Sequence, residues 1–266
     1  MRLSEWHPWI YAFRVGQLQL NRTLSDRFSA IRLATSRTAD PLPVQCMRYQ
    51  SLLRRRLGDT DPQLQENKVV NLRLAVDTMD GVLIRPGETF SFWRLVGSPT
   101  ARKGYLPGLV LRNGEAGVGT GGGLCQLSNL LYWMALHSPL RAVERHHHSF
   151  DAFPDAFRVV PFGTGACVFY NYVDLRLYNP TEITFQFRIV VGEQHLKGEL
   201  LADRELPVTY EIHERGHRFV QVGQRTYREN EIWRSQIDRA TGAALDEQKL
   251  MHNFCEVKYK ADAVAP

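Results

Sequence analysis

The spacing of apolar residues changes along the chain, from a helical period to an alternating one. In the first sixty residues, apolar side chains recur roughly every three to four positions, which predicts a helix. This stripe consists of Trp6, Trp9, Phe13, Leu20, Leu24, Phe28 and Ile31. Further helices are predicted over residues 46–57, from Asp61-Pro62 to Gly81, and over residues 124–136.

From residue 140 onward the apolar period falls to about two, which predicts strands. Residues 173–177 and 183–189 alternate apolar and polar side chains around a turn at residues 179–182, so they predict a hairpin with one buried face. Leu109–Leu111, followed by Asn113-Gly114, predicts another strand and a tight turn.

These elements predict an α+β fold. N-terminal helices should precede a glycine loop and a cysteine-bearing helix that packs on an antiparallel sheet, an order compatible with a papain-like arrangement. We expect a basic helical segment over residues 1–65, a core domain over residues 66–200, and a β-rich extension over residues 201–266 packed on the core.

Charge is concentrated at the N-terminus. The chain carries a net charge of +5, and residues 1–60 hold ten arginines and four acids, a local balance of +6. The favoured interpretation is a solvated helix face whose aromatic residues pack on the core. The second is a weak contact with an anionic membrane surface. Charge alone does not indicate nucleic-acid binding, and none is predicted.

The sequence shows no secretory signal and no membrane span. The apolar residues near the start are interrupted by His7, Pro8 and Arg14, and no apolar run approaches the roughly 18 residues of a spanning helix. We therefore expect a cytoplasmic protein. The four cysteines lack C-x-x-C spacing, which argues against a zinc knuckle and a dense disulfide framework.

A glycine-dense loop, Gly121, Gly122 and Gly123, leads into a helix whose first turn holds Cys125. Unpaired N–H groups and the partial positive charge of a helix start stabilise a thiolate and can bind an oxyanion. Gln126 and Ser128 are candidate side-chain contacts for a substrate. Phosphate binding is disfavoured because no G-K-[ST] follows the loop. The alternative is a buried, inert Cys125 that only packs on the sheet.

Three consecutive histidines follow this helix. On a strand, His146 and His148 share a face and His147 points the other way. One of them near Cys125 would give a thiolate–imidazolium pair, the activation that cysteine hydrolases and acyltransferases use. Asp174 is the candidate for orienting the ring. Other candidates are Asp151, Asp155 and Asn171.

Metal binding by His146, His148 and Cys125 is the other interpretation of the histidine cluster. No carboxylate stands at a ligand-like spacing that strengthens it. We therefore predict no metal and no other cofactor.

Five segments between about residues 66 and 180 resemble, in order, the conserved elements of the VanW family, which is named after glycopeptide (vancomycin) resistance clusters. They are Glu66–Leu72, Arg85–Trp93 (P-G-E-x-F-S-F), Gly121–Leu131 (G-G-G-[IL]-C-Q-x-S), Val143–Ser149 (E-R-H-x-H-S) and Asp174–Asn179 (D-L-K-x-x-N).

The resemblance implies a role in cell-wall metabolism. Some extracellular members look like cysteine-dependent L,D-transpeptidases that act on peptidoglycan stem peptides. Carried over, Cys125 would attack the acyl donor, His148 would act as base and acid, and the glycine loop would hold the oxyanion. The family's namesake retains only the last histidine of the cluster, which favours His148 over His146.

One departure from the family pattern concerns the orienting acid. Many members have Asp-Ala-Thr where this chain has Gly165-Ala166-Cys167, which favours Asp174. Cross-linking takes place outside the membrane, whereas this sequence shows no export signal. Either the reaction acts on a cytoplasmic precursor or another acyl compound, or the chain is exported by an unrecognised route, or it is a non-catalytic cytoplasmic accessory protein. In the last case the protein holds a ligand in the same cleft, and Cys125 is structural.

Overall fold

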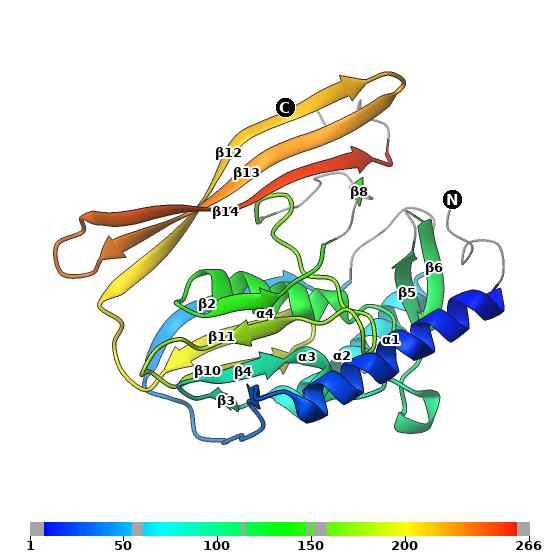
Figure 1. The fold of residues 1–266 in the computed structure, drawn as a ribbon, viewed down its shortest axis with the longest axis horizontal. Helices are drawn as coiled ribbons and strands as arrows, with labels where there is room; N and C mark the ends of the chain where they lie inside the picture. Colours follow the sequence, from blue (N-terminus) through cyan, green and yellow to red (C-terminus); the bar gives the residue numbers. More distant parts are fainter. Residues whose placement is uncertain (1–7, 55–60, 113–114, 148–149, 152–158, 260–266) are drawn as a thin grey trace.

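A computed structural model describes residues 8–54, 61–112, 115–147, 150–151 and 159–259, and these residues form a mixed α+β fold (Figure 1). Four α-helices lie in these ranges: α1 (Pro8–Phe28), α2 (Gln63–Met79), α3 (Phe92–Val96) and α4 (Cys125–Leu136). A short 3-10 helix, η2, covers Ala101–Lys103. None of the helices in the described ranges is both long and apolar enough to cross a membrane.

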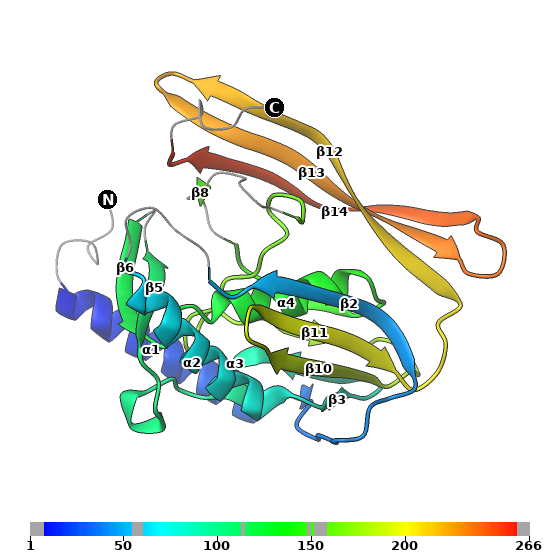
Figure 2. The same ribbon diagram turned by 180° about the vertical axis from the view of Figure 1, so that it is seen from behind.

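The central sheet has the strand order β2-β11-β10-β3 and is antiparallel throughout. Its strands are β2 (Val44–Leu52), β3 (Val82–Ile84), β10 (Phe185–Val191) and β11 (His195–Ala202). Helix α4 packs on β2 and β11, and α2 packs on β10 (Figure 2). Gly198 of β11 makes this packing close, because a Cβ there would lie 2.5 Å from Leu130 Cδ2 and 2.7 Å from Met134 Cε of α4. The helix that carries Cys125 is therefore seated on the sheet by tight apolar packing.

A second sheet has the order β1-β4-β9-β7. Its strands are β1 (Arg32–Leu33), β4 (Glu88–Ser91), β7 (Arg141–Glu144) and β9 (Arg176–Tyr178). Next to α2 stands the antiparallel hairpin of β5 (Pro107–Arg112) and β6 (Glu115–Thr120). The strand predicted at Leu109–Leu111 is thus confirmed, and its turn at Asn113-Gly114 lies outside the described residues.

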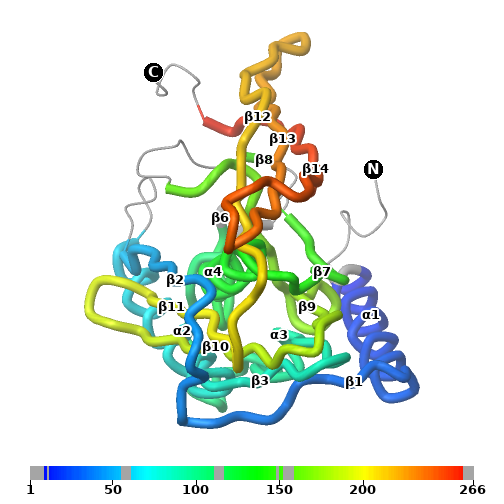
Figure 3. Tube along the Cα trace, turned by 90° about the vertical axis from the view of Figure 1, so that its left-hand side faces the viewer, coloured from blue at the N-terminus to red at the C-terminus, as the bar shows by residue number. Residues whose placement is uncertain are grey.

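A long three-stranded arm ends the chain. Strands β12 (Val208–Val222), β13 (Arg225–Asp238) and β14 (Ala244–Val257) are antiparallel, and β8 (Phe150–Asp151) pairs with β14. The end view shows this arm rising away from the two sheets (Figure 3). The division of the chain at residues 65 and 200 stays a prediction. Strands β1 and β2, from the first segment, pair with β4 and β11.

Two secondary-structure predictions were wrong because tertiary pairing overrides local pattern. A helix was predicted over residues 46–57, but the residues up to Leu52 belong to strand β2. This strand forms the edge of the central sheet and pairs with β11. The predicted hairpin does not form, since β9 and β10 belong to different sheets. Buried Asn179 holds the segment by which the chain passes from one sheet to the other. Its side-chain amide donates to Ile84 O at 2.8 Å and to Ile183 O at 2.7 Å. A papain-like arrangement stays a prediction.

Candidate functional site

The glycine loop before α4 is held in a shape that requires glycine. Gly121 and Gly123 have φ values of +75° and +93°, which disfavour any other residue. A Cβ on Gly122 would lie 2.2 Å from the carbonyl carbon of Gly108 in β5, so the two backbones touch. Buried Asn71 of α2 donates to Gly122 O at 3.0 Å. The loop is thus fixed by α2 and β5 before any ligand binds.

Hydrogen bonds within the protein already use part of the loop. Gly121 N donates to Leu106 O and Gly122 N donates to Gly119 O, both at 3.0 Å. In the described part of the chain, no backbone carbonyl accepts from the N–H of Leu124 or Cys125, and no side chain caps this helix start. The N–H groups of Leu124 and Cys125 are therefore better suited to an oxyanion than those of the predicted Gly121 and Gly122, which already have acceptors.

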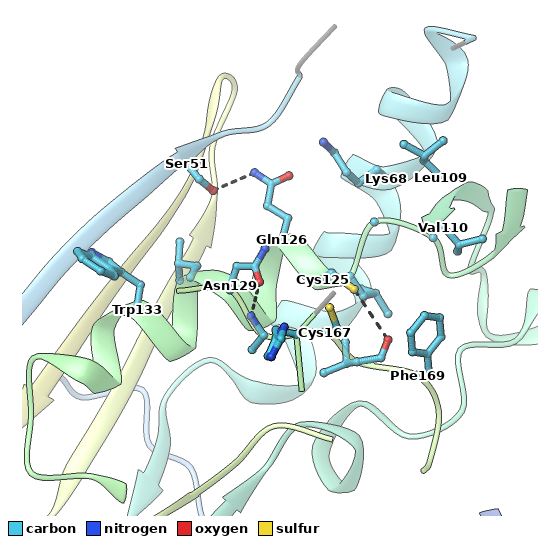
Figure 4. Close-up of a pocket in the computed structure, with 18 of the residues that line it drawn as sticks. Ser51, Lys68, Leu109, Val110, Cys125, Gln126, Asn129, Trp133, Cys167 and Phe169 are labelled. Carbon is cyan, nitrogen blue, oxygen red and sulfur yellow. Dashed lines mark hydrogen bonds between the residues drawn. The ribbon is translucent and has the colours of Figure 1, made fainter. Parts of the chain in front are cut away.

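Two residues in the first turns of α4 clamp the segment after the histidines. Ser128 Oγ donates to Ala166 O at 2.7 Å, and Asn129 Oδ1 accepts from Ala166 N at 2.6 Å. Ser128 is fully buried and is held by this contact, and its predicted contact with a substrate stays a prediction. The clamp places Cys167 and the residue after it beside Cys125 (Figure 4).

Cys125 occupies the first position of α4 and is partly exposed to a cavity. Its Sγ lies 3.9 Å from Val168 O. The hydrogen bond with the Cys167 side chain is the largest influence on the Cys125 thiol and lowers its pKa; burial opposes this, and backbone hydrogen bonds with Val168 and Cys125 itself add to the lowering. The net result is a pKa below the ordinary thiol value, which favours the nucleophilic thiolate.

Two other cysteines, Cys46 and Cys255, differ from Cys125 in the direction in which their pKa is shifted. Burial raises the pKa of Cys46 to about 11, and burial also raises the pKa of Cys255. Neither environment favours a thiolate at neutral pH. Of these three cysteines, Cys125 is the one whose pKa is lowered.

The cavity beside Cys125 has a volume of 1530 Å³. Its lining is rich in aromatic residues: Tyr49, Trp93, Trp133, Phe150, Phe162, Phe169, Tyr170 and Tyr172. Cations also line it: Lys68, Arg48, which pairs with Glu199 at 3.7 Å, and Arg54, which pairs with Glu66 at 2.5 Å. The carboxylate among the described lining residues, that of Asp151, is bonded by Arg228 and Tyr259. The cavity therefore suits an elongated ligand that carries carboxylates.

Lys68 is the most deeply buried of these three cations. It is only 8% exposed, and its Nζ donates to Gln65 Oε1 at 2.7 Å. Its stem lies against Gly123, where a Cβ would come within 2.2 Å of Lys68 Cγ. The third glycine of the loop thus leaves room for a lysine stem two residues from Cys125.

The predicted histidines are only partly placed. His148 lies outside the described residues. His146 Nε2 lies 3.2 Å from Glu144 Oε1, and His146 is not among the cavity residues. His147, predicted to point away, lines the cavity. The described residues include no cluster of three or more His, Cys, Asp or Glu side chains that could hold a metal ion.

Asp174 is committed to a buried network. Its carboxylate accepts from Ser91 Oγ at 2.6 Å, from Trp93 N at 3.1 Å and from Arg176 Nε at 3.0 Å. Arg176 in turn pairs with Asp26 of α1 at 2.6 Å. These contacts give Asp174 a structural role, and none of them joins it to a histidine. Of the other candidates, Asp151 pairs with Arg228, Asn171 contacts Thr23, and Asp155 lies outside the described residues.

Sequence reasoning missed Cys167 as a neighbour of Cys125. The signal that could have identified it was Gly165-Ala166-Cys167, the segment that departs from the family pattern stated above. A glycine at 165 fits because a Cβ there would lie 3.0 Å from Asn129 Oδ1. The contribution of Lys68 was also missed, because only the folded chain brings α2 against the loop.

Comparison with known proteins identifies relatives over nearly the whole chain. Residues 67–201 match the family described as VanW like protein. The chain is 32% identical over 258 residues to the Vancomycin B-type resistance protein VanW of Enterococcus faecalis (strain ATCC 700802 / V583), covering 97% of this chain and 94% of that protein. It is 34% identical over 109 residues to the uncharacterized protein YoaR of Bacillus subtilis (strain 168), covering 41% of this chain and 34% of that protein. No solved structure matches the chain.

Proposed function

The chain belongs to the VanW family, and from this premise we propose that it is a cysteine-dependent acyltransferase or hydrolase of the L,D-transpeptidase type. Its substrates would be peptidoglycan-type stem peptides. The similarity to a vancomycin B-type resistance protein over 97% of the chain supports a role in glycopeptide resistance.

One observation carries the proposal. Cys125 stands at the start of α4, opens onto a large cavity, and has a lowered pKa because of its hydrogen bond with Cys167 and its backbone contacts. A structural cysteine that merely packs in a core would have its pKa raised by burial, as Cys46 does. Exposure to a cavity and a stabilised thiolate together are typical of a nucleophile.

The chemistry follows from this placement. The Cys125 thiolate attacks the carbonyl carbon of the acyl donor, and the N–H groups at the start of α4 stabilise the oxyanion that forms. The C–N bond then breaks, the leaving amine takes a proton from a histidine, and a thioester remains on Cys125. An acceptor amine or water releases the acyl group. By the family pattern His148 supplies and recovers the proton, and His147 is a second candidate because it lines the cavity.

The cavity also favours this class of substrate. Stem peptides are flexible, elongated and rich in carboxylates. A volume of 1530 Å³ accommodates a short peptide, and Arg48 and Lys68 offer positive charge to its carboxylates.

The rate of Cys125 alkylation by iodoacetamide as a function of pH tests the proposal. The rate should follow the thiolate fraction and reach its half-maximum below about 8.5, the ordinary thiol pKa. Removing the hydrogen bond by Cys167→Ala should move the midpoint upward, since the main influence that lowers the pKa is lost. Cys125→Ser identifies the signal, and His148→Ala tests the histidine.

The outcomes separate the two functions. A midpoint that also rises in His148→Ala supports a thiolate–imidazolium pair. A Cys125 thiol that reacts only after the protein unfolds would overturn the proposal and favour a non-catalytic accessory protein.

A further inference from the structure

Helix α1 presents its apolar side to the outside of the protein. Trp9, Phe13 and Phe28 are 70%, 72% and 80% exposed, and Leu20 and Leu24 are also exposed. The prediction that these aromatic residues pack on the core was therefore wrong. The residues stand at positions i, i+4, i+11, i+15 and i+19, which share one face of a helix. The helix thus exposes an apolar stripe from Trp9 to Phe28, interrupted by Gly16 and Gln17 between Phe13 and Leu20.

The opposite face of α1 holds the helix to the protein through polar contacts. Arg22 pairs with Glu144 at 2.6 Å, and Asp26 pairs with Arg176 at 2.6 Å. Gln19 Nε2 donates to Tyr170 O at 2.5 Å. Positions 19, 22 and 26 follow the helical period and share the inward face with Val15, which lines the cavity. These contacts fix the helix with its apolar stripe turned outward.

Charge on this helix is arranged for an anionic partner. Arg14 and Arg27 are exposed and stand next to Phe13 and Phe28, at the borders of the stripe. The single acid of the segment, Asp26, is used by Arg176 on the inward face. The outer side of α1 therefore combines aromatic and aliphatic side chains with cations and no carboxylate.

We propose that α1 docks on an anionic lipid surface, lying in the plane of the interface with its apolar stripe among the acyl chains and its arginines at the headgroups. Large aromatic side chains and flanking arginines are the composition of interfacial helices. A second copy of the chain fits less well, because two such faces would bring arginines against arginines with no acid between them. Figures 1 and 3 show α1 at the outside of the molecule, apart from the arm of β12–β14, so a flat surface can reach it.

Flotation with lipid vesicles tests the docking. The full chain is mixed with vesicles of phosphatidylcholine alone, or of phosphatidylcholine with one-third phosphatidylglycerol, at low and high salt. The wild-type protein should float with the anionic vesicles, and binding should fall by about tenfold on neutral vesicles and at high salt. The double variant Phe13→Ser/Phe28→Ser should lose at least about tenfold of the binding.

Matched controls separate the parts of the proposal. Arg14→Gln/Arg27→Gln should remove the preference for anionic vesicles. Leu245→Ser changes a residue that is 58% exposed on β14 and should bind like wild type. Cys125→Ser should also bind like wild type, so that docking is measured independently of any acyl transfer. Circular dichroism of each variant checks that it is folded.

Two results would overturn the proposal. One is that Phe13→Ser/Phe28→Ser floats no less than the wild type, whether both proteins bind the vesicles or neither does. The other is a concentration-dependent dimer in sedimentation without lipid that the same double variant dissociates, which would make a second copy the occupant of the stripe.

Discussion

Replacing Cys125 with serine should lower the rate of acyl transfer or hydrolysis by at least about 10³-fold. The surroundings of Cys125 stabilise a thiolate through Cys167 and backbone contacts. A serine hydroxyl stays protonated in the same place, so the nucleophile is lost although the shape of the site is kept. The measurement is release of D-alanine from a synthetic stem tetrapeptide, followed by liquid chromatography and mass spectrometry.

The matched control for this substitution is Cys46→Ser. Cys46 lies on β2, and its pKa is raised to about 11 by burial, so it is not a candidate nucleophile. This variant should turn over the tetrapeptide at the wild-type rate. Activity that survives in Cys125→Ser would mean that another group carries the reaction.

Replacing Asp174 with alanine should lower the free energy of unfolding by about 3–5 kcal/mol. The substitution removes the Asp174 carboxylate that pairs with Arg176 Nε at 3.0 Å, and the Arg176 side chain is only 5% exposed. It also leaves Ser91 Oγ and Trp93 N without the acceptor that they use. Unfolding by urea, monitored by circular dichroism, measures the change.

A surface ion pair provides the comparison for Asp174. Glu247 pairs with Arg215 at 2.5 Å, and both side chains are largely solvated. Glu247→Ala should therefore change the free energy of unfolding by less than about 1 kcal/mol. An Asp174→Ala protein of wild-type stability whose Cys125 reacts slowly would contradict the structural role and restore Asp174 as a group that orients the site.

Local signals predicted the parts of the fold that depend on local conformation. The glycines before α4 and the helical period after them identified both the loop and the helix, because positive φ angles and amphipathic spacing are properties of single segments. Strand β2 and the pairing of β10 were missed, since they depend on partners far away in the chain, β11 and β3. The sequence showed the helical pattern of α1, but it did not show which face of the helix turns toward the rest of the protein. Its inward face is set by long-range ion pairs with Glu144 and Arg176.

In the candidate site, too, local sequence identified some residues, whereas others depend on contacts between distant segments. Cys125 was identified from its position after a glycine loop. The contact with Cys167 depends on the clamp that Ser128 and Asn129 place on Ala166, which no spacing in the sequence reveals. Asp174 looked like an orienting acid because strand neighbours are hard to assign from sequence, and its actual neighbours are Ser91, Trp93 and Arg176.

Intact-protein mass spectrometry after mixing the protein with the stem tetrapeptide measures directly whether Cys125 becomes acylated. We expect a covalent adduct whose mass is that of the acyl part of the peptide without its terminal D-alanine. Peptide mapping should locate the adduct on Cys125, and hydroxylamine should remove it. The adduct should be absent in Cys125→Ser and present in Cys46→Ser. No adduct on wild-type protein with a tetrapeptide that it demonstrably binds would contradict acyl transfer through Cys125.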